Sequence, residues 1–215
     1  MIPAVVLAAG KSSRMGRTKA LLPLGTSGET FLGRVIRVLR EGGAEAVVVV
    51  IGGDAAAVRA SLPRDDVHVS AVENPRYEEG QLSSLLVGLA AVEQRHDDIE
   101  AVMVTLVDLP LISADTVRAV REAFVAHPEA PLVRPRRGDR YGHPVIFNRS
   151  IFGELRRADP SRGAKPVVHA HAADGVNVEV DDDGAFIDVD TPEDYERFIG
   201  SRFSDPATSP RRPQS

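Results

Sequence analysis

Short apolar runs rich in β-branched residues alternate along the chain with segments whose apolar residues recur at helical spacing. The apolar runs predict strands over Ala4–Leu7, Ala46–Ile51, Val67–Val72, Ala101–Val107, Leu132–Arg134 and Pro144–Phe147. This alternation is typical of a largely parallel sheet covered by helices. The run Ala101–Val107 is apolar on both alternating faces, which predicts a central strand buried between two helix layers. The residues that follow it should lie at the carboxyl end of the sheet.

Polar residues that can cap helices precede several amphipathic segments. Thr30 stands before apolar positions that cluster on one helix face, and this helix is predicted to end at Gly42–Gly43. Asp54 and Ser113 can cap the next two segments of this kind. Thr191–Asp194 combines a capping hydroxyl, a proline at the first helical position and acids in the first turn, and so predicts a short final helix.

The last third of the chain is less regular. Val176–Val180 and Ala185–Val189 predict a hairpin, with Asp181–Asp183 as its solvated turn. We expect a single domain over residues 1–203. Residues 204–215 are rich in Pro, Ser, Thr and Arg without apolar periodicity, which predicts a disordered tail.

The composition narrows the class of protein. The chain has 215 residues, 43% hydrophobic and 27% charged, as expected for a soluble globular domain with a sizeable core. Its net charge of -5 gives no overall indication of nucleic-acid binding. The absence of cysteine excludes a disulfide framework, thiolate zinc sites and a cysteine nucleophile. No basic region precedes the first apolar run and no run approaches the roughly 20 residues that span a bilayer, so we expect a cytoplasmic protein without a membrane partner.

The segment Leu7–Pro23 follows the first predicted strand and combines small residues with spaced cations. The small residues leave backbone amides open to phosphate oxygens, and Arg14 and Lys19 supply positive charge. We interpret the segment as a triphosphate cradle. A P-loop is excluded although Gly10–Ser12 matches its ending, because Val5 stands where the motif needs a glycine. The alternative interpretation is a glycine turn with solvated basic side chains.

Carboxylates follow two of the predicted strands. Asp108 comes directly after the most apolar strand, in the crevice where open α/β sheets bind ligands, and is the leading candidate for a magnesium ligand. Asp188 and Asp190 are two residues apart on a predicted strand and should therefore share a face. One of them, left undetermined, is expected to complete the metal site. The alternatives are an ordinary strand-ending turn at Asp108 and a capping role for Asp190.

Two further segments carry hydrogen-bonding groups. Asn74–Leu86 places a glycine, an amide and two hydroxyls before a helical pattern, which suits recognition of a nucleobase edge; the alternative is a plain helix cap by Ser83. Gly138–Pro144 is a glycine-rich turn into a strand, and its His143 is the candidate for binding the acceptor; the alternative is a hairpin connection. The remaining histidines show no metal-ligand spacing, so no zinc site is predicted: His68, His96, His127, His169 and His171.

The motifs Leu7–Pro23, Gly80–Ser84, Asp108–Pro110, Gly142–Pro144 and Asp188–Asp194 occur in the order seen in the MobA-like nucleotidyltransferase (NTP transferase) family. The chain resembles this family up to about Ile199. Ala8–Gly10, the following serines and the Gly-His-Pro segment resemble the molybdenum cofactor cytidylyltransferases more than the guanylyltransferases, whose opening usually carries a second glycine before the loop.

This resemblance implies a Rossmann-like three-layer αβα fold of the glycosyltransferase-A type, with a mixed, mostly parallel central sheet. It implies transfer of CMP from CTP to a phosphorylated acceptor, molybdopterin bearing its metal, with release of pyrophosphate and a molybdoenzyme or chaperone as partner. Lys19, Arg14 and Asp108 would be catalytic, and Asp108 with Asp188 or Asp190 would hold Mg²⁺. The nucleotide-binding residues would be Leu7, Ala8, Ala9, Gly10, Ser12, Ser13, Arg14, Lys19, Gly80 and Ser84.

Three other functions fit parts of the pattern. A related transferase would couple CTP or GTP to a sugar, polyol or choline phosphate. A non-catalytic accessory protein would bind the cofactor and deliver it, although Lys19 and Asp108 argue against this. A glycosyltransferase using a nucleotide-sugar would normally have paired aspartates after the central strand, where this chain has Asp108–Pro110.

Overall fold

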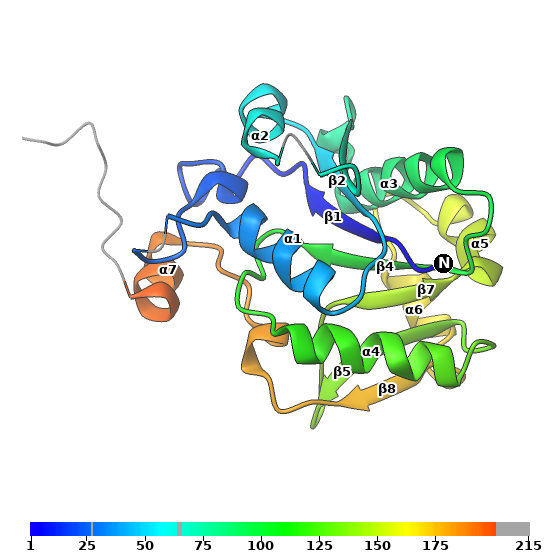
Figure 1. The fold of residues 1–215 in the computed structure, drawn as a ribbon. Coiled ribbons are helices and arrows are strands. Elements are labelled where there is room, and N and C mark those ends of the chain that lie inside the picture. Colours follow the sequence, from blue (N-terminus) through cyan, green and yellow to red (C-terminus); the bar gives the residue numbers. More distant parts are fainter. Residues whose placement is uncertain (27, 64–65, 201–215) are drawn as a thin grey trace, which may run out of the picture.

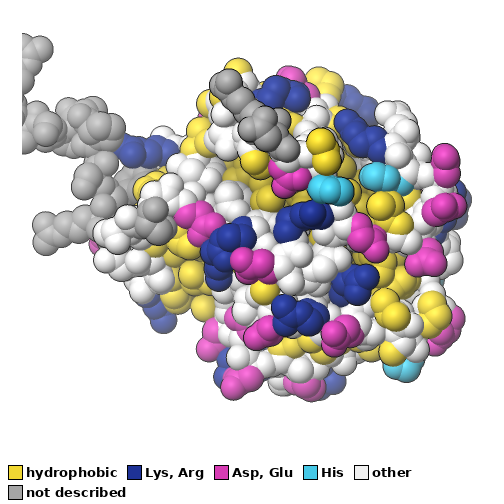
Figure 2. All heavy atoms as spheres, in the orientation of Figure 1, with side chains coloured by type: hydrophobic (Ala, Val, Ile, Leu, Met, Phe, Trp, Pro, Cys, Tyr) yellow, Lys and Arg dark blue, Asp and Glu magenta, His cyan; other side chains and the backbone are white. Residues whose placement is uncertain are grey.

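The computed structural model describes residues 1–26, 28–63 and 66–200 (Figure 1). The predicted disordered tail, residues 204–215, therefore lies outside the described residues. Within the described part, no helix combines the length and the apolar character needed to cross a bilayer. On the face shown in Figure 2, basic and acidic side chains are interspersed rather than gathered into one basic patch.

A mixed sheet forms the middle of the molecule (Figure 1). Its strands are β1 Ala4–Ala8, β2 Val47–Ile51, β3 Val69–Glu73, β4 Ala101–Leu106, β5 Leu132–Arg137, β6 Arg140–Tyr141, β7 Val145–Asn148 and β8 Val176–Glu179. The order is β3-β2-β1-β4-β7-β5, and β6 and β8 also pair with β5. Strands β1 to β4 are parallel, and β7 is antiparallel to both β4 and β5. The carboxyl ends of β1, β4 and β5 therefore point to the same edge of the sheet.

Helices cover both faces of the sheet and give the predicted three layers. They are α1 Phe31–Glu41, α2 Ala55–Ser61, α3 Gln81–Arg95, α4 Ala114–Ala126, α5 Phe152–Arg157, α6 Lys165–Ala170 and α7 Pro192–Ile199, with 3-10 turns η1 Lys19–Leu21, η2 Tyr77–Glu79, η3 Arg149–Ile151 and η4 Asp183–Phe186. Alternate strand side chains enter two apolar clusters. Val6 and Met103 pack with α1 and α4, in front of the sheet in Figure 1, whereas Val5 and Val104 pack with α3 and α5.

The predicted caps are confirmed at three helices. The Thr30 hydroxyl accepts from the Gly33 amide at 3.0 Å, and the Ser113 hydroxyl accepts from the Thr116 amide at 3.1 Å. Thr191 and Asp194 form a reciprocal capping box, and a proline occupies the first turn of that helix. Asp54 does precede α2, but its carboxylate accepts from the Thr18 hydroxyl and makes no cap bond.

The predicted C-terminal hairpin is wrong. Val176–Glu179 pairs in parallel with β5, and Ala185–Val189 forms no strand because the chain turns through η4 instead. Asp182, read as part of a solvated turn, accepts from the Ser113 amide at 2.9 Å and the Thr116 hydroxyl at 2.6 Å. This segment is therefore tied to the start of α4 rather than to β8.

Candidate nucleotide and metal site

The loop after β1 is folded back by its own hydrogen bonds. The Ser12 carbonyl accepts from the amides of Met15 at 3.0 Å and Gly16 at 3.1 Å, and the Ser12 hydroxyl accepts from the Lys19 amide at 3.1 Å. Ser12 has a left-handed φ of 52°. Met15 is 2% exposed and packs in a third apolar cluster with Phe31. These contacts fix the backbone that carries Arg14 and Lys19.

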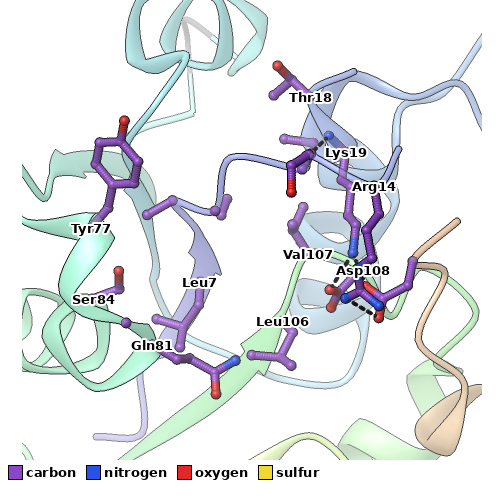
Figure 3. A pocket seen from close by; sticks show the side chains of 18 residues that line it. Leu7, Arg14, Thr18, Lys19, Tyr77, Gln81, Ser84, Leu106, Val107 and Asp108 are labelled. Carbon is purple, nitrogen blue, oxygen red and sulfur yellow. Dashed lines mark hydrogen bonds and ion pairs between the residues drawn. The ribbon is translucent and has the colours of Figure 1, made fainter. Parts of the chain in front are cut away.

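The two cations of this loop meet two of the predicted carboxylates (Figure 3). The Lys19 ammonium lies 2.9 Å from Asp108 Oδ2 and also bonds Asp190 Oδ1. An Arg14 guanidinium nitrogen lies 2.8 Å from Asp190 Oδ2. The Lys19 side chain is only 10% exposed. The loop after β1, the end of β4 and the segment before α7 are thus joined by a single charge cluster, which we call the Lys19 cluster: Arg14, Lys19, Asp108 and Asp190.

Electrostatics within the Lys19 cluster favour the charged forms. Burial alone would lower the pKa of Lys19, but the charges of Asp108 and Asp190 and their hydrogen bonds outweigh it, so the pKa is raised. Burial would likewise raise the pKa of Asp190, but Lys19 and Arg14 lower it. The cluster is therefore a mutually neutralised set of charges in a site that is partly removed from water.

The segment before α7 reaches Asp108 through its backbone. The Val189 amide donates to the Asp108 carbonyl at 2.8 Å, and the Val189 side chain is fully buried. Asp188 and Asp190 flank this buried residue, so they still lie close together although no strand forms there. Burial, followed by the charges of Asp108 and Asp190, raises the pKa of Asp188, although much of this residue is exposed.

The donor set fits a hard divalent cation. Asp108 Oδ1 is buried without a hydrogen-bond partner, and a carboxylate oxygen left bare in this way is a suitable ligand for Mg²⁺. After burial, the charges of Asp108 and Asp190 contribute to the raised pKa of Asp188, and a cation would relieve that repulsion. Across the described ranges, no three acidic or histidine side chains are already grouped for metal binding. Substrate phosphate oxygens and water would supply the remaining ligands.

A cavity of about 330 Å³ lies beside the Lys19 cluster, at the carboxyl ends of β1 and β4. In Figure 3, Arg14, Lys19 and Asp108 lie on one side of it, and Tyr77, Gln81 and Ser84 lie on the other. The lining contains every residue predicted to bind the nucleotide: Leu7, Ala8, Ala9, Gly10, Ser12, Ser13, Arg14, Lys19, Gly80 and Ser84. Asp108 and Asp190 also line it.

The structure adds lining residues that the sequence did not single out: Thr18, Ala20, Tyr77, Gln81, Leu106 and Val107. Tyr77 and Gln81 lie within the segment proposed to read a base, so their positions beside Gly80 were the available signal. No sequence signal marked the apolar Leu106, because it reaches the cavity only through its position at the carboxyl end of β4.

The wall opposite the Lys19 cluster is held by a buried amide. Asn74 is 1% exposed, and its Nδ2 donates to the hydroxyls of Ser83 at 2.8 Å and Ser84 at 3.0 Å. The capping residue of α3 is Gly80, with a φ of 102°, so the alternative of a cap by Ser83 is wrong. The Ser83 hydroxyl instead donates its proton to a backbone carbonyl, and that of Gly80 lies nearest, at 2.8 Å.

His143 does not line this cavity. Its Nδ1 lies 3.2 Å from the carbonyl oxygen of Val104 on β4, and its backbone amide donates to the Ala185 carbonyl at 3.0 Å. Burial lowers the pKa of His143, although the Val104 carbonyl and the charge of Asp108 oppose the shift. The imidazole is therefore neutral at physiological pH. The hairpin expected as the alternative for this segment is present as β5 and β6.

A sheet between two helix layers, with a polar cavity at its carboxyl edge where loop cations face strand-end carboxylates, places the chain among the α/β proteins that bind ligands in a crevice at the strand ends. The chain belongs to the MobA-like NTP transferase family, whose domain matches residues 4–176.

The chain is similar to curated proteins that carry several different names. The chain is 30% identical to a molybdenum cofactor guanylyltransferase of Xanthomonas euvesicatoria, with 91% of this chain and 93% of the relative covered. It is 22% identical to the molybdenum cofactor cytidylyltransferase of Escherichia coli, with 90% and 93% covered. A nicotine blue oxidoreductase of Paenarthrobacter nicotinovorans is 31% identical, with 70% and 72% covered. The bifunctional protein GlmU of Agrobacterium fabrum is 30% identical, but the chain spans only 32% of the length of that protein.

Solved structures agree with the fold. Rv0371c of Mycobacterium tuberculosis superposes with a TM-score of 0.78 at 34% identity, covering 93% of this chain and 98% of that one. A complex of Rv0371c with manganese superposes with a TM-score of 0.73 at 33% identity, again covering 93% of this chain and 98% of that one. The predicted family and fold class are thus confirmed.

Proposed function

We propose that this chain transfers a nucleoside monophosphate, CMP from CTP, to the terminal phosphate of molybdopterin and releases pyrophosphate. The observation that carries the proposal is the Lys19 cluster beside a cavity lined by all the residues expected to bind a nucleotide. Similarity to two molybdenum cofactor nucleotidyltransferases over about nine-tenths of each chain supports the acceptor. The alternative acceptors are sugar, polyol and choline phosphates, and the alternative function is cofactor delivery without catalysis.

The reaction is an in-line displacement at phosphorus. An oxygen of the acceptor phosphate forms a bond to the α-phosphorus of the triphosphate while the bond from that phosphorus to the pyrophosphate oxygen breaks. No covalent enzyme intermediate is required, and catalysis is mainly positioning and charge stabilisation. Backbone amides of the loop after β1 would bind the phosphates, and Arg14 and Lys19 would turn from Asp190 to the negative charge on the leaving pyrophosphate.

Asp108, with Asp188 or Asp190, would hold Mg²⁺ in this site. When bound, the ion neutralises phosphate charge and orients the reacting groups. The bare Asp108 Oδ1 is the chain's main contribution to this ligand set. Asp190 is already paired with Arg14 and Lys19, whereas burial and neighbouring carboxylates raise the pKa of Asp188. The two carboxylates therefore differ in how readily they would bind a metal ion.

The base would lie against the wall formed by Tyr77, Gly80, Gln81 and Ser84. Gln81 has both a donor and an acceptor, so it can pair with the edge of cytosine. The preference for CTP over GTP rests on Ala8–Gly10 with the following serines and on Gly142–Pro144, which resemble the cytidylyltransferases. Release of pyrophosphate, measured with each of the four triphosphates against molybdopterin and the alternative acceptors, tests the class of reaction and its specificity together. If none of the four triphosphates gives pyrophosphate release with any acceptor, the proposal is contradicted.

The metal role is tested by Asp108→Asn, which keeps the side-chain shape and the Asp108 carbonyl that binds Val189. We expect turnover to fall by a factor on the order of 10³, since loss of a metal ligand costs several kcal/mol of barrier. Asp115→Asn, an exposed acid on α4, is the matched control and should leave turnover unchanged. A folded Asp108→Asn protein with near-normal turnover would contradict the assignment.

A further inference from the structure

The β5–β6 hairpin carries several arginines, and one of them differs from the rest. The others are each paired with carboxylates: Arg136 with Glu179 at 3.3 Å, Arg137 with Asp181 at 3.0 Å and Asp183 at 2.8 Å, and Arg140 with Asp183 at 3.1 Å. Arg134 is 9% exposed and, among the described residues, has no carboxylate partner. Its Nε donates to the neutral amide oxygen of Asn177 at 3.0 Å.

The Arg134 guanidinium supports an aromatic ring. Its central carbon lies 3.6 Å from the centre of the Tyr141 ring, which is the geometry of a stacked cation–π contact. Burial lowers the pKa of Arg134, and the neighbouring Tyr141 opposes that shift. A guanidinium remains protonated in proteins, so this charge persists beneath the ring. Tyr141 is nevertheless 50% exposed, and the ring is therefore fixed from one side and open to solvent on the other.

The stacked pair lies on the face of the sheet that packs against α3, and the first turn of α3 lines the cavity. Arg134 alternates with Val133, which belongs to the α1–α4 cluster, and shares a face with Leu132 in the α3 cluster. The cavity residue Leu7 belongs to the same α3 cluster. Two residues after Tyr141, His143 contacts β4 through the Val104 carbonyl. Since neighbouring strands are about 5 Å apart, Tyr141 lies roughly one or two strand spacings from the line of β4.

We propose that Tyr141, backed by Arg134, is a stacking platform for a planar heteroaromatic ring in the acceptor. The inference rests on the proposed function, because the acceptor phosphate must reach the Lys19 cluster while its ring lies on Tyr141. A ring held rigid before binding loses little conformational entropy when a ligand stacks on it. Stacking accepts varied substituents but requires an aromatic partner, which sugar, polyol and choline phosphates lack.

The test uses 6-hydroxymethylpterin, a fluorescent planar heterocycle without phosphate, titrated into the full chain without triphosphate. We expect binding by the wild type, about tenfold weaker binding by Tyr141→Ala and Tyr141→Leu, and binding within about threefold of wild type by Tyr141→Phe. Tyr141→Leu keeps an apolar cover over Arg134, and binding of CTP with Mg²⁺ reports that each variant is folded. Glucosamine 1-phosphate, a sugar phosphate, should not compete with the pterin.

Pterin binding that is absent, or that is equal in wild type and Tyr141→Leu, would overturn the platform. Competition by glucosamine 1-phosphate would also count against it. Failure of the platform is separable from failure of the proposed function. Tyr141-dependent pterin binding without pyrophosphate release from any triphosphate would retain the platform and reject the reaction. CMP transfer to molybdopterin with an unchanged acceptor KM in Tyr141→Leu would retain the reaction and reject the platform.

Discussion

Lys19 occupies the position between carboxylates that a divalent cation would need. Its ammonium contacts Asp108 and Asp190, so lysine and a bound metal would compete for the same charges until triphosphate oxygens drew the lysine away. Free metal ions should therefore bind the nucleotide-free protein weakly, and the triphosphate and metal should bind together.

This competition predicts opposite effects of Lys19→Ala on two measurements. Turnover should fall by roughly 10²–10³-fold, since one preorganised charge is lost from the transition state. Binding of Mn²⁺ alone, measured by calorimetry without nucleotide, should become tighter by about tenfold or more because a competing positive charge is removed. Lys165→Ala at the start of α6 is the control, since Lys165 lies outside the cavity lining, and it should change neither value strongly. Weaker Mn²⁺ binding by Lys19→Ala would contradict the competition.

Asp188 gives a pH-dependent prediction. Its pKa is raised above the ordinary value of 3.8 by burial and by two neighbouring carboxylates. The folded state therefore holds the proton more tightly than the unfolded chain, so this group favours folding below the unfolded pKa and loses that contribution as pH rises through the folded pKa.

Asp188→Asn should consequently raise the Tm of the metal-free protein at pH 7 by about 1–2 °C, a small effect because water screens the exposed carboxylate. The difference should shrink as pH falls toward the ordinary aspartate pKa. Thermal unfolding followed from pH 3.5 to pH 8 measures it. A Tm gap that grows as pH falls would show that the stated charge repulsion is not the cause.

Helix α3 carries the wall opposite the Lys19 cluster, and its distance from the sheet is set by one residue. A β-carbon on Gly88 would lie 2.5 Å from Val5 Cγ1 and 3.1 Å from Val50 Cγ2. The helix can therefore approach β1 and β2 closely only with glycine at this position. This close packing determines where Gly80, Gln81 and Ser84 stand at the mouth of the cavity.

Gly88→Ala should lower the Tm by several degrees, because overpacking costs about 1–3 kcal/mol and exceeds the roughly 1 kcal/mol gained in helix propensity. Gly153→Ala in α5 is the matched control: the nearest neighbour of its β-carbon would be an arginine tip at 3.4 Å, so stability should hold or rise. Thermal unfolding of both variants distinguishes crowding from a general effect of alanine. Equal Tm values for the two variants would argue against close packing at Gly88.

Across the whole molecule, the chain divides the carboxyl edge into two parts. Residues before Asp108 supply the loop after β1 and the start of α3, which form the proposed nucleotide side, whereas the β5–β7 hairpin approaches β4 from the other side. His143 belongs to this second part. Because its Nδ1–H donates to the Val104 carbonyl, Nε2 of the neutral imidazole is unprotonated and can accept a hydrogen bond from an N–H or O–H group of the acceptor.

His143→Ala should therefore raise the KM for the acceptor while binding of CTP, measured by calorimetry without acceptor, stays within about threefold. His127→Ala provides a control histidine on the exposed end of α4. Loss of CTP binding with an unchanged acceptor KM would place His143 on the nucleotide side or in the scaffold.

The sequence by itself determined the layered architecture and most of the residues that line the cavity. Apolar runs, caps and glycine-rich strand ends act locally, so β1, β4, α1 and the cap of α7 followed from neighbouring residues. Contacts between distant segments needed the tertiary structure. Parallel pairing of β8 with β5, the bond from Asp182 to Ser113 and the meeting of Lys19 with Asp190 join residues far apart in the chain, and no local pattern specifies such partners. The stacked pair of Arg134 and Tyr141 is a further case, because periodicity shows neither burial of an arginine nor the ring that covers it.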